Sequence, residues 1–302
     1  MEFKNLDQEK AFMKKEAKRL KISSMAAYTT YYAKKLLEKL TLINNGDLVV
    51  KGSFSQYVHL CTLSRPVLDI DLSSLQSHQI PINILFQAIY ETYSSVVSYD
   101  LNTSPRQTKN GVYKIPVVAK VRYEGSKEMV VPVPIDFKEN NKVIFETQFK
   151  AVEPLFEGDK KFYINTPSFE EHIAEKLYII AHNTKEDVLN TRVKDFYDVY
   201  KLFDKDYDSD KFSLYFEAMV LMYGMHLEDI SAEFLNKDFV KRHEELWNLM
   251  KKKYEFVDQE VSLDEAVFYT KAILNEQVQK IKSGQLKEQA YSLVRKKGTM
   301  SF

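Results

Sequence analysis

Patterns typical of β-strands are confined to the first half of this 302-residue chain, and this segregation constrains its fold most strongly. Runs rich in valine and isoleucine at 112–123 and 128–137 flank the turn sequence Glu124-Gly125-Ser126-Lys127, which predicts a β-hairpin. After about residue 165 the apolar residues recur only with helical spacing. The sequence therefore predicts an α+β fold, in which a small mixed β-sheet is flanked by helices and followed by a helical C-terminal domain.

The change in pattern near residue 165 also gives the expected domains, 1–165 and 166–302. In the first half the expected helices are 7–22, 24–40, 54–60 and 81–98, and the expected strands besides the hairpin are 48–50, 66–72 and 142–147. In the second half the expected helices are 168–183, 191–204, 211–224, 230–235, 237–253, 262–282 and 285–295.

Composition excludes several classes of protein. The 43 basic and 43 acidic residues cancel, so a global basic field is absent, although a local basic patch remains compatible with nucleic-acid binding. The N-terminus is too charged for a signal peptide, and no apolar run is long enough to span a membrane, so we expect a cytoplasmic protein. The single cysteine, Cys61, excludes an internal disulfide, and we expect its side chain to be buried.

Two acidic residues alternate with apolar ones in the expected strand 66–72. Asp69 and Asp71 share one face of such a strand, while Ile70 and Leu72 point into the core. Two adjacent carboxylates repel each other unless they face water or a cation, and carboxylates together with phosphates suit Mg²⁺. The alternative is an edge strand with a solvated acidic face.

Two further elements are consistent with a phosphate-transfer site. Gly52 and Ser53 directly follow a short strand, where glycine permits close backbone approach and a following helix start can hold phosphate. Asp136 lies near the end of the second hairpin strand. If that strand lies beside the strand that carries Asp71, three carboxylates converge, as a metal-dependent phosphoryl-transfer site requires. A simple turn and a solvated strand end are the respective alternatives.

The helical half contributes charged residues beside apolar stripes. Lys176 lies at the flank of the stripe of helix 168–183, where it could reach a cleft or remain solvated. Asp195 and Asp198 are three residues apart and therefore neighbours on one flank of the helix 191–204. The alternative for these two aspartates is an exposed face with intrahelical ion pairs.

Taken in chain order, these elements resemble the AbiEii family within the DNA polymerase β-like nucleotidyltransferase superfamily. The resemblance covers about residues 48–203 and rests on four blocks: Lys51-Gly52-Ser53, Arg65-x-x-x-Asp69-Ile70-Asp71-Leu72, Ala174-Glu175-Lys176-Leu177 and Asn190-Thr191-Arg192-x-Lys194-Asp195-Phe196-Tyr197-Asp198. The chain departs from the family in having Gly52-Ser53-Phe54 where many members have Gly-Gly-Thr. The fold that the resemblance implies is a nucleotidyltransferase core.

The resemblance implies roles in the first half of the chain. Asp69 and Asp71 would bind Mg²⁺, with Mn²⁺ as an alternative, and the superfamily implies Asp136 as a third metal ligand. Gly52 and Ser53 would hold the nucleotide triphosphate.

It implies further roles for charged residues. Arg65 would support the phosphates or the acidic strand. Lys176 would contact nucleotide phosphates, and one of Asp195 and Asp198 would be a required acid.

The implied activity is that of a nucleotidyltransferase toxin of a type IV toxin–antitoxin system, acting in abortive infection and phage defence. It would transfer nucleotides from an NTP to RNA, with the 3′ end of tRNA as the expected acceptor. The antitoxin would be encoded alongside and need not bind the toxin directly. The candidate basic surfaces for RNA are Lys34, Lys35 and Lys39, Lys251 to Lys253, or Arg295 to Lys297.

Two alternatives to this function are left open. The first is a transferase that modifies a small molecule such as an aminoglycoside, and the second is a non-catalytic nucleotide-binding module. A deep acidic pocket without an RNA-binding surface would favour the first, and failure to bind Mg²⁺ with NTP would favour the second.

Overall fold

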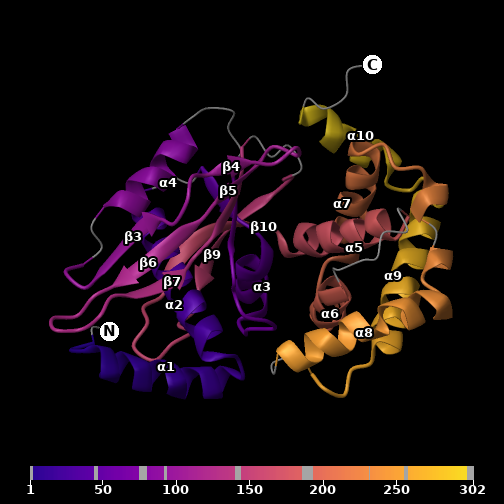
Figure 1. The fold of residues 1–302 in the computed structure, drawn as a ribbon. Coiled ribbons are helices and arrows are strands. Elements are labelled where there is room, and N and C mark those ends of the chain that lie inside the picture. Colours follow the sequence, from indigo (N-terminus) through magenta and orange to yellow (C-terminus); the bar gives the residue numbers. More distant parts are fainter. Residues whose placement is uncertain are drawn as a thin grey trace. The chain divides into compact units, whose positions relative to one another are not determined.

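The computed structural model of the chain (Figure 1) describes residues 3–43, 47–74, 80–91, 94–139, 144–185, 193–230, 232–254 and 258–297. The chain divides into two units, one comprising Met1–Asn141 with Thr147–Pro167 and the other Lys142–Glu146 with Ser168–Phe302. The predicted domains, 1–165 and 166–302, differ from these units by two residues at the boundary and by the segment 142–146. As domains they remain a proposal.

The helices of the first unit follow local capping signals. They are α1 (Leu6–Leu20), α2 (Ser24–Ile43), α3 (Gly52–Leu60) and α4 (Ile80–Tyr90). The side chain of Asn5 accepts a hydrogen bond from the backbone N–H of Gln8 and caps α1, and the Ser23 hydroxyl accepts one from Ala26 and caps α2. The helices predicted at 7–22, 24–40 and 54–60 are confirmed, whereas the one predicted at 81–98 ends at Tyr90.

The described strands form two sheets in the first unit. The seven-stranded sheet has the order β4-β5-β8-β2-β1-β10-β9, and the three-stranded sheet has the order β3-β6-β7. The strand bounds are β1 (Leu48–Val50), β2 (Ile70–Ser74), β3 (Val97–Leu101), β4 (Arg106–Gln107), β5 (Val112–Ile115), β6 (Val117–Val121), β7 (Met129–Pro132), β8 (Ile135–Lys138), β9 (Thr147–Val152) and β10 (Phe162–Pro167). The large sheet is mixed, because β1 runs parallel to β10 and antiparallel to β2, while β2 runs parallel to β8.

The predicted hairpin is present but each of its arms is divided. β6 and β7 pair antiparallel in the small sheet, whereas β5 and β8 pair antiparallel in the large one. The two breaks fall at Pro116 and at Val133-Pro134. Proline has no N–H to donate to a ladder, which explains why continuous strands over 112–123 and 128–137 are not formed. The predicted strand 66–72 begins only at Ile70, and β9 begins at Thr147, where the strand predicted at 142–147 ends.

The core of the first unit lies between the helices and the sheets. Helix α2 contacts both β10 of the large sheet and β7 of the small one, so it joins the two sheets. Its buried side chains include Leu36, Leu37 and Leu40, and they belong to the same apolar cluster as the inward side chains of β1 and β2.

The second unit is helical, as predicted. Its helices are α5 (Phe169–Lys185), α6 (Val193–Leu202), α7 (Ser209–Met222), α8 (Lys237–Lys253), α9 (Leu263–Ser283) and α10 (Lys287–Lys296), with 3-10 turns η1 (Leu227–Ile230) and η2 (Ala232–Phe234). Helix α5 packs against α6 and α7, and α9 packs against α6 and α8. None of the helices in the described ranges is both long and apolar enough to cross a membrane.

The prediction that Cys61 is buried is wrong. Cys61 is exposed and carries a free thiol. It is the residue at which α3 ends, and its backbone adopts the left-handed conformation with φ of 55°. The chain therefore turns away from the helix axis at Cys61, so its side chain lies outside the apolar face that α3 buries.

Candidate functional site

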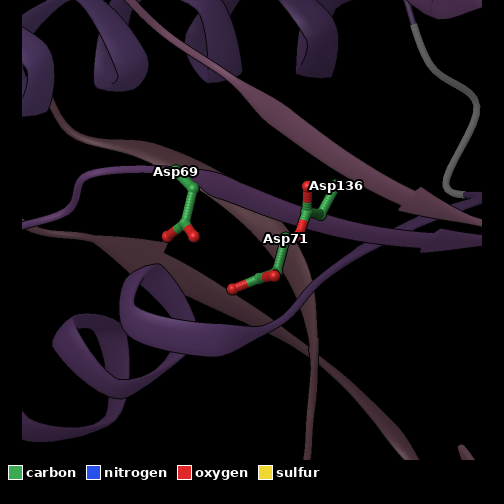
Figure 2. A group of neighbouring side chains, drawn as sticks. All are labelled: Asp69, Asp71 and Asp136. Atoms are coloured by element: carbon green, nitrogen blue, oxygen red, sulfur yellow. The ribbon is translucent and has the colours of Figure 1, made fainter. Parts of the chain in front are cut away.

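Three carboxylates converge in the first unit (Figure 2). Asp71 on β2 lies directly opposite Asp136 on the adjacent parallel strand β8, and Asp69 immediately precedes β2. One carboxylate oxygen from each residue lies within 4.8 Å of the others. All three side chains are half-buried, so they border solvent without being surrounded by it. The structure thus brings together the three acidic residues that the sequence suggested as metal ligands.

The strand beneath this acidic cluster is rigidly packed. Ile70 and Leu72 alternate with the acidic residues and are 0% and 2% exposed. The backbone N–H of Ile70 donates to the carbonyl of Pro134 at 2.9 Å, which fixes the start of β2 beside β8. A packed strand holds neighbouring carboxylates at a constant separation, and a metal site needs this constancy. The alternative of an acidic edge strand is excluded, since β2 has neighbours on both sides.

Lys114 is a residue of this site that the sequence did not reveal. It is the cross-strand partner of Asp136 on β5, and its ammonium forms an ion pair with the Asp136 carboxylate. The Lys114 side chain is 43% exposed, so it can move away when another cation approaches Asp136. Only the register between β5 and β8 identifies this lysine, because nothing in its local sequence distinguishes it.

Glycine is required at position 52. Gly52 has φ of +61°, and a Cβ atom there would lie 1.7 Å from Oδ2 of Asp71. The neighbouring Lys51 N–H donates to the Asp71 carbonyl at 2.8 Å, which draws the two backbones together. The close approach that glycine permits here is therefore to the acidic cluster itself.

The start of α3 provides anion-binding groups beside the acidic cluster. The first N–H groups of a helix have no intrahelical acceptor, and the helix dipole favours a negative charge there. Ser53, in the first turn of α3, is 3% exposed, and its hydroxyl has no hydrogen-bond partner within the described part of the chain. This hydroxyl and the helix N-terminus together suit a phosphate group.

Arg65 lies half-buried in the loop that connects α3 to β2, four residues before Asp69. This position is compatible with either of the supporting roles expected for it, and both stay predictions.

The remaining predicted residues form a separate cluster in the second unit. Lys176 on α5 donates to Asp195 and Asp198 on α6, with Nζ to oxygen distances of 3.2 and 2.9 Å. The side chains of these three residues are 8%, 1% and 0% exposed, respectively. A solvated Lys176 and an exposed face at Asp195 and Asp198 are therefore excluded. Asn190–Arg192 of the fourth sequence block lie outside the described residues.

Lys176, Asp195 and Asp198 form a buried lysine cluster in which opposite charges compensate one another. Buried carboxylates are strongly destabilising unless a cation compensates them, and the Lys176 ammonium pairs with both of these. The arrangement fixes the Lys176 side chain through two directed hydrogen bonds. Both aspartates, three residues apart on α6, take part in this arrangement.

Comparison with known proteins agrees with this geometry. The profile of the family described as "Nucleotidyl transferase AbiEii toxin, Type IV TA system" matches residues 36–269. A search among curated proteins gives no match.

Two solved structures are similar to this chain. One is a presumed nucleotidyltransferase from H. pylori, with 16% identity, a TM-score of 0.44, and coverage of 85% of this chain and 97% of that one. Another is an antigenic nucleotidyltransferase-like protein from Paracoccidioides brasiliensis, with 12% identity, a TM-score of 0.36, and coverage of 68% and 91%. At these values the two likenesses carry no argument about activity.

The family profile spans both the acidic cluster and the lysine cluster, and it extends over most of the chain. Membership implies a nucleotide as substrate and an antitoxin as partner. The chain belongs to the AbiEii family, and it is a nucleotidyltransferase toxin of the type IV toxin–antitoxin class.

Proposed function

We propose that this enzyme transfers nucleotides from an NTP to the 3′ end of an RNA, with tRNA as the first acceptor to test, and that Mg²⁺ is the metal it uses. The observation that carries the proposal is the convergence of Asp69, Asp71 and Asp136, with ligand oxygens within 4.8 Å of one another. The family assigns the reaction class, and the acidic cluster supports its dependence on a divalent cation.

The donors of the acidic cluster fit Mg²⁺. They are carboxylate oxygens only, which favours a hard cation over metals that prefer nitrogen or sulfur ligands. Mn²⁺ takes the same ligands and is expected to substitute. When bound, such a cation neutralises the negative charge that develops on the transferred phosphoryl group.

The chain's own groups bind and orient the nucleotide in this proposal. The N-terminus of α3 and the Ser53 hydroxyl hold the phosphates, and Gly52 lets them approach the β2 carboxylates closely. The 3′ oxygen of the acceptor then forms a bond to the α-phosphorus. The bond from the α-phosphorus to the bridging oxygen breaks, pyrophosphate leaves, and the hydroxyl proton passes to water.

Lys176 is the proposed contact to nucleotide phosphates. Asp195 and Asp198 are then positioning residues, because their carboxylates hold the Lys176 ammonium. This assigns a role to both aspartates instead of one required acid.

The basic surface proposed for RNA must be revised. Lys34 and Lys39 are 1% and 8% exposed, since Lys34 pairs with Asp159 and Lys39 donates to the Glu91 carbonyl. These two lysines stabilise the first unit and are not available to RNA. Among the remaining candidates, Lys252, Arg295 and Lys296 are exposed and stay part of the proposal.

The antitoxin is proposed to counteract the enzyme without a stable complex. Mixing the two purified proteins and measuring their molar mass by light scattering tests this point, since a complex of summed mass would contradict it.

A transfer assay tests the proposed function. Purified protein is incubated with Mg²⁺, each labelled NTP in turn, and total bacterial RNA, and the products are separated by size. We expect label on small RNA, no label with Asp69→Asn, and full labelling with Asp100→Asn, whose carboxylate lies on β3 in the small sheet. Label on no RNA with any NTP would contradict the RNA acceptor and leave a small-molecule acceptor to examine.

A further inference from the structure

A row of four charged residues crosses the large sheet, one on each of four neighbouring strands. Asp71 on β2 is opposite Asp136 on β8, and Asp136 is in turn opposite Lys114 on β5. Lys114 is opposite Arg106 on β4, which forms one edge of the sheet (Figure 1). Residues directly opposite each other on paired strands point to the same face of a sheet. The row therefore begins in the acidic cluster and becomes basic towards the β4 edge.

The basic end of this row is open to solvent. Arg106 is exposed, and the Lys114 side chain is 43% exposed. The opposite face of the same strands is apolar, with Ile115, Ile135 and Phe137 buried in the core of the first unit. Because the members of the row are consecutive cross-strand partners, no buried residue separates the two cations from the acidic cluster.

The two cations form a pair that an anion would stabilise. Like charges directly opposite each other on paired strands are destabilising. Arg106 makes no ion pair with the described part of the chain, and Lys114 pairs with Asp136. When a metal ion takes the Asp136 carboxylate, the Lys114 ammonium needs another anion. A guanidinium beside an ammonium suits a phosphate group, which can accept hydrogen bonds from both.

The geometry of the transfer indicates which phosphates these cations meet. In an in-line displacement the attacking and leaving oxygens are on opposite sides of the phosphorus. The proposed function puts the phosphates of the NTP at the start of α3, directly after β1, and β1 and β8 flank β2 on opposite sides. Pyrophosphate therefore leaves on the β1 side of the acidic cluster, and the acceptor approaches on the β8 side. The basic end of the row lies on that side.

The strand spacing gives the reach of the row. With about 4.8 Å between neighbouring strands, the backbone at Lys114 is ~10 Å from that at Asp71, and the backbone at Arg106 is ~14 Å from it. At ~3.4 Å per nucleotide along a stacked strand, these distances correspond to about three or four nucleotides. The two cations are thus level with the last few phosphates of a strand whose 3′ end is at the acidic cluster.

We propose that Arg106 and Lys114 bind backbone phosphates of the acceptor RNA, within the last few nucleotides before the end that is extended. The proposal rests on the proposed function, because it takes the acceptor to be RNA. Phosphate contacts fix the register of a nucleic acid without reading its bases, so this pair positions the acceptor and does not select its sequence. Neither residue takes part in the transfer chemistry.

The salt dependence of RNA binding tests the contact at Arg106 independently of transfer. The probe is a short fluorescein-labelled oligoadenylate, titrated with the full-length protein at several salt concentrations, without NTP or divalent cation, and followed by fluorescence anisotropy. Each phosphate contact to a single strand contributes about 0.7 to the slope of log affinity against log salt concentration. Arg106→Gln should therefore reduce this slope by ~0.7 and weaken binding about fivefold at low salt. Arg106→Lys keeps the charge and should keep the slope.

Arg122→Gln is the matched control, because it removes an exposed arginine directly after β6, in the small sheet. It should change neither the slope nor the affinity. An equal loss in Arg122→Gln and Arg106→Gln would overturn the proposal, since only the net charge of the protein would then matter. An unchanged slope in Arg106→Gln would also overturn it, as would native protein that does not bind the probe. Arg106 would then only protect the exposed edge of β4 from pairing with another strand.

Transfer kinetics distinguish the acceptor from the nucleotide as the source of the bound phosphates. With Mg²⁺ present, Arg106→Gln and Lys114→Gln should each raise KM for RNA about fivefold and leave KM for NTP unchanged. A raised KM for NTP with an unchanged KM for RNA would overturn the proposal, because the two cations would then hold the triphosphate.

The failures of the two proposals are distinguishable. Asp69→Asn should bind the oligoadenylate at least as tightly as the native protein and transfer nothing. Transfer that proceeds with an unchanged KM for RNA in both variants removes the phosphate contacts alone. Absence of transfer to any RNA removes the proposed function, and the salt slope measured without NTP still decides whether Arg106 contacts RNA phosphates.

Discussion

The two clusters of acidic residues in this enzyme differ in where their positive charge comes from. Asp69, Asp71 and Asp136 are half-buried and border solvent, and the exposed Lys114 pairs with Asp136. Asp195 and Asp198 are instead buried around one buried ammonium, that of Lys176. Clustered carboxylates repel one another, so the first cluster is suited to receive a cation from solution, whereas the second contains its own.

The two clusters thus differ in burial as an exchangeable metal site and a lysine-positioning cluster are expected to differ. An acidic cluster that exchanges a metal must stay accessible, and its loss should affect activity more than stability. A cluster that positions a lysine can be largely buried, and its loss should affect stability as well. Substitutions in each cluster therefore test the comparison directly.

The largest effect is expected for Asp71→Asn. It removes a charge from the accessible acidic cluster while keeping the shape of the side chain, so transfer should fall by at least about 100-fold. The melting temperature should stay close to that of the native enzyme, because the substitution also removes a repulsion. Initial rates of NTP incorporation and thermal unfolding measure the two quantities, and unfolding without loss of rate would reverse the assignment.

Lys176→Met should destabilise the second unit by about 3–5 kcal/mol, since it removes an ammonium that pairs with two buried carboxylates. Urea unfolding measures the change in the free energy of unfolding. Lys201→Met is the matched control, because Lys201 pairs with Asp258 at the surface, and it should cost less than about 1 kcal/mol. Adding Asp198→Asn to Lys176→Met should restore part of the stability. Equal stability of the two lysine variants would show that the lysine cluster is not buried.

Lys114→Met should change the metal dependence modestly. The Lys114 ammonium competes with a cation for the Asp136 carboxylate, so its removal should lower the Mg²⁺ concentration for half-maximal rate by about two- to fivefold. A titration of rate against Mg²⁺ at saturating NTP gives this value. A higher Mg²⁺ requirement would mean that Lys114 assists nucleotide binding instead.

The smallest effect is expected for Glu9, a buried carboxylate that accepts hydrogen bonds from two neutral tyrosine hydroxyls. Tyr32 and Tyr123 donate to Glu9 at 2.5 and 2.8 Å, and burial raises the pKa of Glu9 above 4.5 although these hydrogen bonds lower it. Because the pKa of Glu9 is raised in the folded protein, the unfolded chain loses this proton at a lower pH than the folded protein does. The contribution to stability is thus full below about pH 4.5 and declines as pH rises through the folded pKa.

Glu9→Gln should therefore remove this decline, and its stability relative to the native enzyme should grow as pH rises above 4.5. Urea unfolding across this pH range measures it, with Glu157→Gln at an exposed ion pair as the control. Parallel stability curves for the native enzyme and Glu9→Gln would show that Glu9 keeps an ordinary pKa when buried.

The local parts of the fold were predictable, and the parts that depend on register were not. The alternation around Asp69 and Asp71 and the helical spacing after residue 165 are local patterns, and the structure confirms them. The proximity of Asp136 to Asp71 depends on parallel pairing between β2 and β8. The sequence could therefore predict it only if the two strands were assumed to be neighbours. Lys114 was missed for the same reason.

Other errors have equally specific causes. The breaks at Pro116 and Pro134 distribute the predicted hairpin over two sheets, although its turn was recognised correctly. The burial of Lys34 and Lys39 was missed because each is paired with a residue distant in sequence. Their charges on a helix favoured an exposed face, which the tertiary ion pairs override.

The metal site is tested most directly by measuring Mn²⁺ binding with electron paramagnetic resonance, in which bound ion loses the signal of free Mn²⁺. We expect that native enzyme with NTP binds Mn²⁺, that Asp71→Asn and Asp136→Asn lose most of this binding, and that Asp198→Asn keeps it. Undiminished Mn²⁺ binding in both Asp71→Asn and Asp136→Asn would contradict the claim that the accessible acidic cluster is the metal site of this nucleotidyltransferase.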